Sequence, residues 1–219
     1  MAPARFITFE GGEAVGKSTQ IERLAQRLRE TGGEVLVTRE PGGTPLGEQI
    51  RHLLKHAPEG QGMNPKTELL LFLASRAELV RKVIGPALDR GVWVLCDRFH
   101  DSTTVYQGAG RGVPHEIVDR LNAVAIGTRM PGLTLVLDVE PEQARARLLE
   151  RAGSIATVAA AGTPDRMEAQ PAEFFERVRA GYAALAEAHP ERVKVVHAHG
   201  NVDETAAAIW EQVTKTFSL

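Results

Sequence analysis

The chain has 219 residues, of which 43% are hydrophobic and 25% are charged, and its formal net charge is −2 at pH 7. This length suits one α/β domain with a substantial core, so we expect a single domain over residues 1–219. The balanced charge gives no global attraction to nucleic acid or to a membrane surface, and neither is an expected partner. No apolar run approaches the roughly 20 residues of a spanning helix, so we expect a cytoplasmic protein.

Strand and helix patterns alternate from one end of the chain to the other. Short apolar runs without strict alternation, typical of strands buried on both faces, lie at 5–10, 34–38, 92–97, 133–139 and 193–198. Helical stretches lie between and after them, at 17–30, 45–56, 66–90, 115–127, 141–152, 171–188 and 203–217. This order predicts an α/β fold with a doubly wound five-stranded parallel sheet and helices on both faces.

The first predicted strand runs into a loop that matches G-x-x-x-x-G-K-[ST] and then into a helix, as this phosphate-binding motif requires. Glycines let backbone N–H groups turn around phosphate oxygens at the start of a helix, where the dipole favours anions. Lys17 is expected to neutralise the β and γ phosphates, and the Ser18 hydroxyl to bind Mg²⁺. The residues expected to bind ATP here are Gly11, Gly12, Glu13, Ala14, Val15, Gly16, Lys17, Ser18 and Thr19.

The ends of the second and third predicted strands carry further charged residues. Arg39 follows the second strand, Asp97 ends the third, and Arg98 follows it. In a doubly wound sheet ligands bind outside the carboxyl ends of the strands, so these side chains are expected near the phosphate loop. Two arginines beside a triphosphate site indicate a second anion.

Six segments resemble those of bacterial thymidylate kinases, within the P-loop nucleoside monophosphate kinases. They are FEGGEAVGKST (9–19), TREPGGT (38–44), LLLFLASRAELV (69–80), DRFHDSTTVYQGAGRG (97–112), LTLVLDVEPEQARAR (133–147) and DRMEAQPAEFFERVRAGY (165–182). The resemblance covers nearly the whole chain. It implies a nucleotide-kinase fold with a helical lid at about 147–168, a homodimer, and Mg²⁺-dependent phosphorylation of dTMP by ATP on the route to dTTP.

The resemblance also implies roles on the acceptor side. Phe72 would stack on the thymine, although a core aromatic on a helix is the alternative from the sequence alone. Arg76, one turn further along the same helix, would donate to a pyrimidine carbonyl. Arg39 and Arg98 would clamp the 5′-phosphate, since guanidinium groups bind phosphate bidentately.

The same resemblance places other polar residues around the acceptor. Ser102, Tyr106 and Gln107 would line the base and sugar pocket. Glu13 would face the acceptor and contact the sugar 3′-hydroxyl, unless its side chain points into solvent. Asp97 would help to hold Mg²⁺, directly or through water, and a turn-forming aspartate is the alternative.

Phosphoryl transfer needs cations around the moving group. Some members of the family carry a catalytic arginine in the phosphate loop, but here that position is Ala14, and the bacterial pattern places the arginine in the lid. Arg166 is the first candidate, Arg147 and Arg151 are the others, and solvated helix faces are the alternative for the last two. The small uncharged insertion at 152–164 departs from the usual short bacterial lid.

Two other functions stay open from the sequence. One is another nucleoside or nucleotide kinase of the same fold, and the other is a P-loop switch protein that hydrolyses nucleotide slowly. A GTPase would be expected to carry an N-K-x-D motif, and the sequence contains none. The acceptor-side set has no evident use in a switch, so the kinase interpretation is favoured.

Overall fold

The computed structural model describes residues 3–140, 142–144, 165–198 and 200–219. Its centre is a five-stranded sheet in the order β2-β3-β1-β4-β5, and all the neighbouring strands are parallel. The strands are β1 Phe6–Gly11, β2 Val35–Arg39, β3 Trp93–Asp97, β4 Leu133–Asp138 and β5 Val193–His197. The predicted parallel sheet is therefore confirmed, with strand ends that differ from the prediction by one residue at most.

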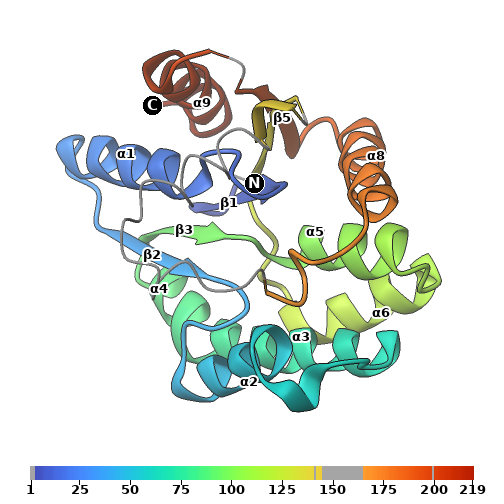
Figure 1. The fold of residues 1–219 in the computed structure, drawn as a ribbon. Helices are drawn as coiled ribbons and strands as arrows, with labels where there is room; N and C mark the ends of the chain where they lie inside the picture. Colours follow the sequence, from blue (N-terminus) through green and yellow to red (C-terminus); the bar gives the residue numbers. More distant parts are fainter. Residues whose placement is uncertain (1–2, 141, 145–164, 199) are drawn as a thin grey trace, which may run out of the picture.

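Helices cover both faces of the sheet (Figure 1). They are α1 Lys17–Glu30, α2 Pro45–Lys55, α3 Pro65–Leu79, α4 Gly85–Asp89, α5 His100–Thr103, α6 His115–Ile126, α8 Ala172–Ala188 and α9 Val202–Phe217. Shorter turns are the 3₁₀ turn η1 Pro58–Gly60 and the π-helical η2 Val80–Ile84 and η3 Thr104–Gly110. Within the described residues, no helix is long and apolar enough to cross a bilayer.

Two hydrophobic layers hold the helices to the sheet. On one face, α1 and α9 bury Leu24, Leu28 and Ile209 against the strand residues Leu95 and Leu135. On the other face, the end of α3, α4 and α6 pack around the opposite side of β1 and β3, where Cys96 is fully buried. This arrangement explains why the strand sequences are apolar at successive positions, since each strand faces a helix layer on either side.

Two helical regions differ from the prediction. The stretch predicted as one helix over 66–90 is interrupted by the π-helical η2 between α3 and α4. The segment after β3 is helical over 100–110, where no helix was predicted. Its β-branched residues and glycines have low helix propensity, but the segment packs against α8 and α6, and tertiary contacts override the local preference.

The predicted helix at 141–152 and most of the predicted lid lie outside the described residues. Of the lid, residues 165–168 are described, and they lead into α8. The other helices agree with the prediction to within one residue at each end.

Candidate active site

The loop between β1 and α1 has the backbone shape that anion binding requires. Gly11 and Gly16 have φ of 121° and 95°, a region that glycine occupies at little cost. A Cβ at Gly11 would collide with the carbonyl oxygen of Leu137 on β4, so only glycine fits there. Gly16 directly precedes α1 and offers no side chain to cap it. The N–H groups at the start of this helix are therefore available to an anion.

Lys17 is held inside this loop. It is buried, and its Nζ donates to the carbonyl oxygen of Gly12 at 2.5 Å. Burial, and then the nearby Arg98, lowers the pKa of Lys17 to about 8. Ser18 and Thr19 are exposed on the first turn of α1. The loop thus brings together a buried cation and two exposed hydroxyls, and their predicted contacts with ATP and Mg²⁺ stay a prediction.

Arg98 connects the phosphate loop to the segment after β3. Its Nη2 pairs with Oε1 of Glu13 at 2.7 Å, and its Nη1 donates to the carbonyl oxygen of Gly11 at 2.9 Å. Burial acts to raise the pKa of Glu13, but Arg98, Lys17 and Lys55 outweigh it and lower the pKa to about 2. Glu13 is therefore ionised at neutral pH, and it lines the cavity described below.

Glu10, which the sequence interpretation did not single out, organises the wall beside Arg98. Its fully buried carboxylate accepts from Ser102 Oγ at 2.5 Å, from Tyr182 OH at 2.7 Å and from the backbone N–H of Phe99 at 2.8 Å. Burial, with the nearby Asp101, raises the pKa of Glu10 to about 7. These contacts fix Ser102 at the edge of the cavity described next.

A cavity lies beside the phosphate loop, at the carboxyl ends of β2 and β3. It is lined by Glu13, Glu40, Pro41, Lys55, Phe72, Arg76, Arg98, Ser102, Thr103, Tyr106, Gln107 and Met167. Every residue that we predicted for the acceptor side, except Arg39, is in this set. Phe72 is only half-buried and faces the cavity from α3, so the alternative of a closed core aromatic does not hold.

Arg39 lies elsewhere. Its guanidinium is half-exposed, and its Nη2 lies 2.9 Å from both carboxylate oxygens of Glu48 on α2. The expectation that Arg39 lines the acceptor site is therefore not met in this arrangement. Arg51, which was not predicted, lies close by and donates to the carbonyl oxygen of Pro41 at 2.9 Å. Burial, and then Arg39, lowers the pKa of Arg51.

Arg76 lines the cavity, yet its donors are engaged within the protein. Nε and Nη2 lie 2.8 Å and 2.6 Å from Oε2 of Glu40. Nη1 donates to Thr103 and Asn122, and Nη2 to the carbonyl oxygen of Phe99, at 2.9–3.1 Å. The side chain is 1% exposed. Its predicted contact with a pyrimidine carbonyl stays a prediction, and the role that its contacts support directly is to fix this wall.

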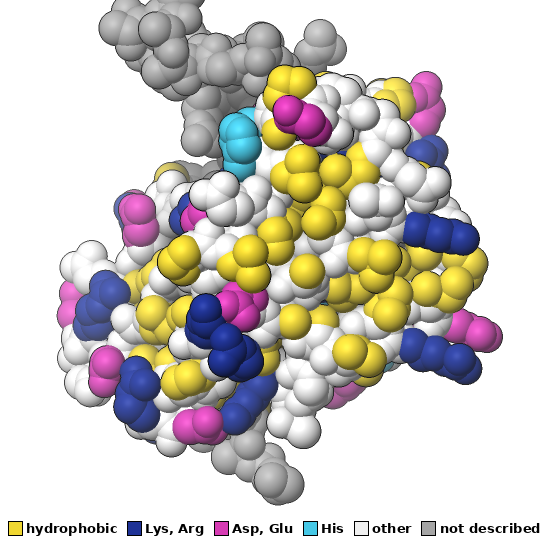
Figure 2. Space-filling model, turned by 90° about the horizontal axis from the view of Figure 1, so that it is seen from below, with side chains coloured by type: hydrophobic (Ala, Val, Ile, Leu, Met, Phe, Trp, Pro, Cys, Tyr) yellow, Lys and Arg dark blue, Asp and Glu magenta, His cyan; other side chains and the backbone are white. Residues whose placement is uncertain are grey.

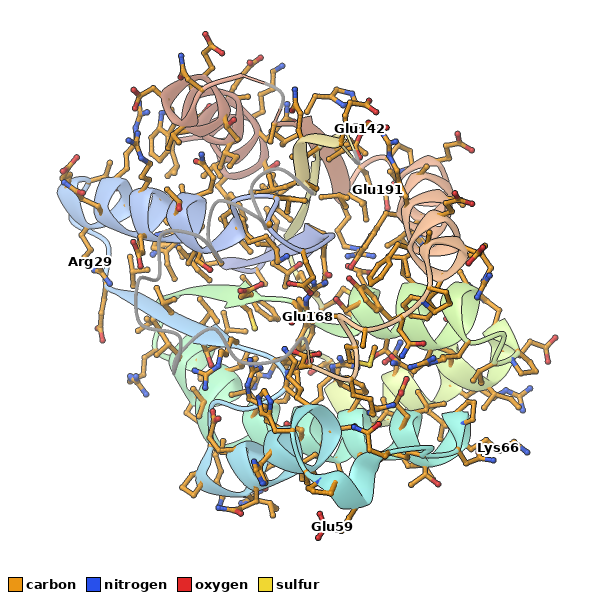
Figure 3. The ribbon with its side chains drawn as sticks, viewed as in Figure 1. Arg29, Glu59, Lys66, Glu142, Glu168 and Glu191 are labelled. Atoms are coloured by element: carbon orange, nitrogen blue, oxygen red, sulfur yellow. The ribbon has the colours of Figure 1, made fainter. Side chains whose placement is uncertain are left out.

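Arg166 does not lie where we predicted. Its Nη1 pairs with Oε2 of the buried Glu68 at 2.5 Å, and its Nε donates to the carbonyl oxygen of Leu54 at 2.9 Å. The backbone of Arg166 also bonds to Lys55. Figure 3 shows Glu168, two residues further on, on the segment that passes from this anchor to α8. Arg166 is thus tied to α2 and α3 instead of facing the phosphate loop, while Arg147 and Arg151 lie outside the described residues.

The donor set expected for Mg²⁺ is present at the end of β3. Oδ1 of Asp97 is buried and has no hydrogen-bond partner in the part of the chain that the structure describes. An unpaired carboxylate oxygen beside the phosphate loop, with the exposed hydroxyl of Ser18, suits a hard cation. The described residues contain no cluster of three His, Cys, Asp or Glu side chains that could hold a metal alone. Magnesium held by few protein ligands and by substrate phosphates fits this set.

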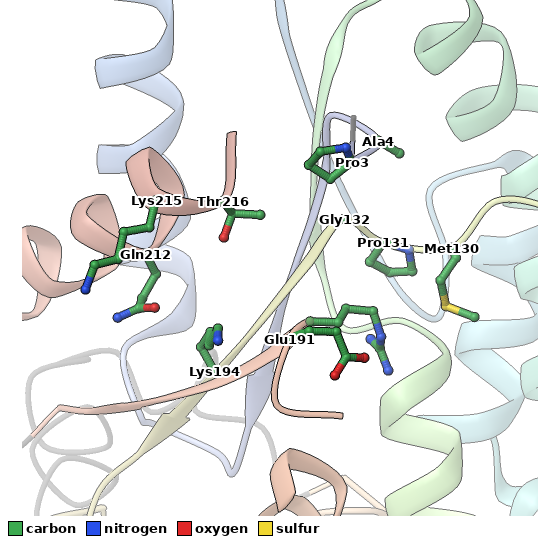
Figure 4. Close-up of a pocket in the computed structure, with 11 residues that line it drawn as sticks. Pro3, Ala4, Met130, Pro131, Gly132, Glu191, Lys194, Gln212, Lys215 and Thr216 are labelled. Carbon is green, nitrogen blue, oxygen red and sulfur yellow. The ribbon is translucent and has the colours of Figure 1, made fainter. Parts of the chain in front are cut away.

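A second cavity lies at the opposite end of the strands (Figure 4). Its lining includes Ala4, Gly132 and Glu191, which precede β1, β4 and β5. It therefore opens at the amino ends of the strands, away from the phosphate loop. Ligands of doubly wound folds bind at the carboxyl ends, so the cavity beside the phosphate loop is the candidate active site.

Some lining residues were missed by the sequence interpretation. Glu40 and Pro41 directly follow Arg39, and Thr103 follows Ser102, so their place in the motifs could have indicated them. Lys55 and Met167 come from the end of α2 and from the segment before α8. Their neighbourhood depends on tertiary packing, and no local pattern marks it.

Comparison with known proteins agrees with this geometry. The family model for thymidylate kinase matches residues 9–209. Thymidylate kinases of Syntrophotalea carbinolica and Deinococcus radiodurans are 46% and 47% identical, each over 98% of this chain and over 97% and 98% of their own lengths. The crystal structure of thymidylate kinase from Ehrlichia chaffeensis is 34% identical, with a TM-score of 0.74, over 95% of this chain and 97% of that one. The chain therefore belongs to the thymidylate kinase family.

Proposed function

We propose that the chain transfers the γ-phosphoryl group of ATP to dTMP and releases ADP and dTDP. The observation that carries this proposal is the direct contact between two sites: the Arg98–Glu13 ion pair joins the phosphate loop to the cavity that holds Phe72 and Gln107. A switch protein has no need of such a second cavity. Another nucleotide kinase of this fold would need a different acceptor pocket.

On the donor side, the phosphate loop would bind ATP through its backbone N–H groups and through Lys17. The buried ammonium group of Lys17 acts where little water screens it, so its attraction for the β and γ phosphates is strong. Ser18 and Asp97 would hold Mg²⁺, which supplies charge neutralisation of the phosphates when bound. Arg98, which contacts Glu13 and Gly11 and lines the cavity, would contact the phosphate that receives the transferred group.

On the acceptor side, Phe72 would stack on the base, and Ser102 and Tyr106 would border the sugar. Glu13, ionised and paired with Arg98, would accept a hydrogen bond from the sugar 3′-hydroxyl. An acceptor phosphate needs little general-base help, because its second pKa is about 6 and its oxygens are largely ionised at neutral pH. Arg147 and Arg151, outside the described residues, remain the proposed lid contacts to the transferring group.

A homodimer also remains a proposal. The helices α2, α3 and α6 expose Leu46, Leu70, Ile117 and Val124, which are 44–82% exposed. The view in Figure 2, from below the molecule of Figure 1, shows hydrophobic side chains across this face, with Lys, Arg, Asp and Glu side chains among them mainly on the left half. Exposed apolar surface of this kind is typical of contacts between subunits. The cytoplasm stays the predicted location.

One assay tests the proposed reaction. ADP release is measured with ATP and Mg²⁺ in the presence of dTMP, dUMP, dCMP, dAMP or dGMP. We expect dTMP to be preferred strongly over dCMP and the purine nucleotides, and less strongly over dUMP, because one methyl group contributes only about 1–3 kcal/mol. A kcat/KM for dAMP that is comparable with that for dTMP would contradict the proposal.

A further inference from the structure

The buried carboxylate of Glu68 on α3 accepts hydrogen bonds from several side chains behind the acceptor cavity. Glu68 is 1% exposed, and it is not among the residues that line the cavity. Its Oε1 accepts from Nε2 of Gln107 at 2.9 Å and from Nε of Arg111 at 3.2 Å. Its Oε2 accepts from Nη2 of Arg111 at 3.1 Å and from Nη1 of Arg166 at 2.5 Å. Three elements distant in the sequence thus meet at one side chain.

These partners keep Glu68 ionised. Burial acts to raise its pKa, but hydrogen bonds from Arg111 and Gln107 and the charge of Arg111 outweigh burial, and the pKa is lowered. An ionised carboxylate can only accept hydrogen bonds. A side-chain amide that contacts it must therefore present its NH₂ group, and Gln107 has no freedom to turn the other way.

This constraint decides which end of Gln107 faces the ligand. Gln107 is 2% exposed and lines the cavity, whereas the carboxylate that holds its Nε2 lies behind the cavity wall. Its Oε1 receives no hydrogen bond from any described residue, and it is not among the fully buried polar atoms without a partner. The carbonyl end is thus the free end of the amide, on the cavity side.

We propose that Glu68 is a positioning residue that fixes the carbonyl oxygen of Gln107 toward the cavity and thereby selects a pyrimidine that carries an N3–H group. Thymine and uracil have this donor, and cytosine has an unprotonated N3 acceptor in its place. Two facing acceptors repel each other and leave both groups unpaired, which disfavours a cytosine nucleotide. This inference rests on the proposed function, because it concerns the base of the same acceptor.

Arg111 and Arg166 favour the ionised form of Glu68 from outside the cavity. Arg111 follows η3, and Arg166 lies at the described end of the predicted lid segment. Neither lines the cavity. Either guanidinium group stabilises the carboxylate, and the carboxylate orients the amide, so base selection would depend on Glu68, a residue that the base does not touch.

The test is the substitution Glu68→Gln, measured as kcat/KM for dTMP, dUMP and dCMP. A neutral amide at position 68 can donate or accept, so Gln107 becomes free to turn its NH₂ group toward N3 of cytosine. We expect the dTMP/dCMP ratio to fall by at least about tenfold. The dTMP/dUMP ratio should stay unchanged, because both bases carry N3–H and differ only in a methyl group. A general loosening of the site would move both ratios.

Matched variants separate base selection from stability. Arg111→Met removes an ion pair but leaves the carboxylate, so it should lower the melting temperature and keep the dTMP/dCMP ratio. Glu68→Asp keeps an acceptor-only group and should retain more of the ratio than Glu68→Gln. If Glu68→Gln does not fold, Gln107→Ala leaves the Glu68–arginine ion pairs intact and should still lower the ratio.

The outcomes distinguish the inference from the proposed function. A wild-type enzyme that does not prefer dTMP over dCMP contradicts the proposed function itself. A selective wild-type enzyme whose Glu68→Gln or Gln107→Ala variant keeps the dTMP/dCMP ratio overturns the role of Glu68. An equal fall in the dTMP/dCMP and dTMP/dUMP ratios would also overturn it.

Discussion

Arg98 lies where the two proposed ligand sites meet, and its backbone adopts an uncommon conformation. Its φ is 68°, a region that costs a residue with a side chain free energy on the order of 1–3 kcal/mol. The contacts with Glu13 and Gly11 hold it there, and its guanidinium lies 5.0 Å from the centre of the Tyr106 ring. Such strain is tolerated where position matters more than local stability, which suits the proposed contact of Arg98 with the acceptor phosphate.

For Lys17, the lowered pKa predicts a pH-dependent affinity for ATP. A cation whose pKa is about 8 is protonated at pH 7 and loses its charge as the pH rises past 8. ATP binding measured by calorimetry should therefore weaken between pH 7 and pH 9, by up to about tenfold per pH unit above the pKa. Lys17→Ala should bind ATP poorly and without this dependence, and it should still bind dTMP. A wild-type affinity that is constant over this range would contradict the prediction.

The sequence could predict single residues only where a contiguous motif defines their surroundings. Lys17 and Ser18 belong to such a motif, and they lie at the start of α1, directly after the glycine loop. Arg166 does not: its partner Glu68 lies 98 positions away, and an arginine in a lid segment has the same local pattern whether it faces a phosphate or a buried carboxylate. Similarly, nothing near Arg76 in the sequence indicates that Glu40, Thr103 and Asn122 would take up its donors.

At the scale of elements, periodicity predicted the strands and the long helices because their apolar residues face a common core. It could not predict α5 and η3, whose residues favour other conformations in isolation. Asp101 in α5 is held by two bonds from Arg192 and one from Thr134, and η3 packs against α8. These contacts come from β4, β5 and their flanks, so this helix depends on the assembled sheet.

The segment before α8 supplies a prediction on stability. Arg166→Ala removes a buried ion-pair partner of Glu68, whose side chain is 1% exposed, and should lower the free energy of unfolding by about 2–4 kcal/mol. Arg179, whose pairs with Asp138 and Glu140 leave its side chain 45% exposed, is the matched control, and Arg179→Ala should cost less than about 1 kcal/mol. Urea unfolding measures both.

Activity measurements on Arg166→Ala and Arg151→Ala address the lid. Since Arg166 is anchored away from the phosphate loop, single-turnover transfer by folded Arg166→Ala should stay closer to that of the wild type than transfer by Arg151→Ala. If Arg166→Ala lost single-turnover transfer while its free energy of unfolding stayed unchanged, the contact with the transferring group would be assigned to Arg166.

For the whole molecule, the strand order explains why residues from distant parts of the chain share one site. With β1 and β3 adjacent and parallel, the phosphate loop after β1 and the residues Asp97 and Arg98 at the end of β3 lie at the same carboxyl end of the sheet. The second cavity opens at the amino ends of the strands, and the exposed apolar residues of α2, α3 and α6 do not line the candidate site. Nucleotide binding and subunit contact can therefore occupy different surfaces.

The proposed homodimer gives a prediction at this scale. Leu70 on α3 is 56% exposed, and Leu70→Glu should convert a dimer to a monomer by placing a charge in the apolar contact. Val202, 44% exposed at the start of α9 on another side of the molecule, is the control, and Val202→Glu should leave the mass unchanged. Sedimentation velocity measures both. A wild-type protein that is monomeric at micromolar concentration would contradict the proposal.

The orientation of the side chains in one wall of the cavity depends on how many residues the π-helical turn η3 contains. Such a turn holds one residue more than the α-helical path it replaces, and each residue rotates the side chains that follow it by about 100°. Tyr106 and Gln107 both lie within η3. Losing one residue at the start of η3, before Tyr106, would rotate these side chains around the helix axis even if every remaining residue kept its identity. Variation in the length of this part of η3 is therefore more harmful to the cavity wall than variation in its composition.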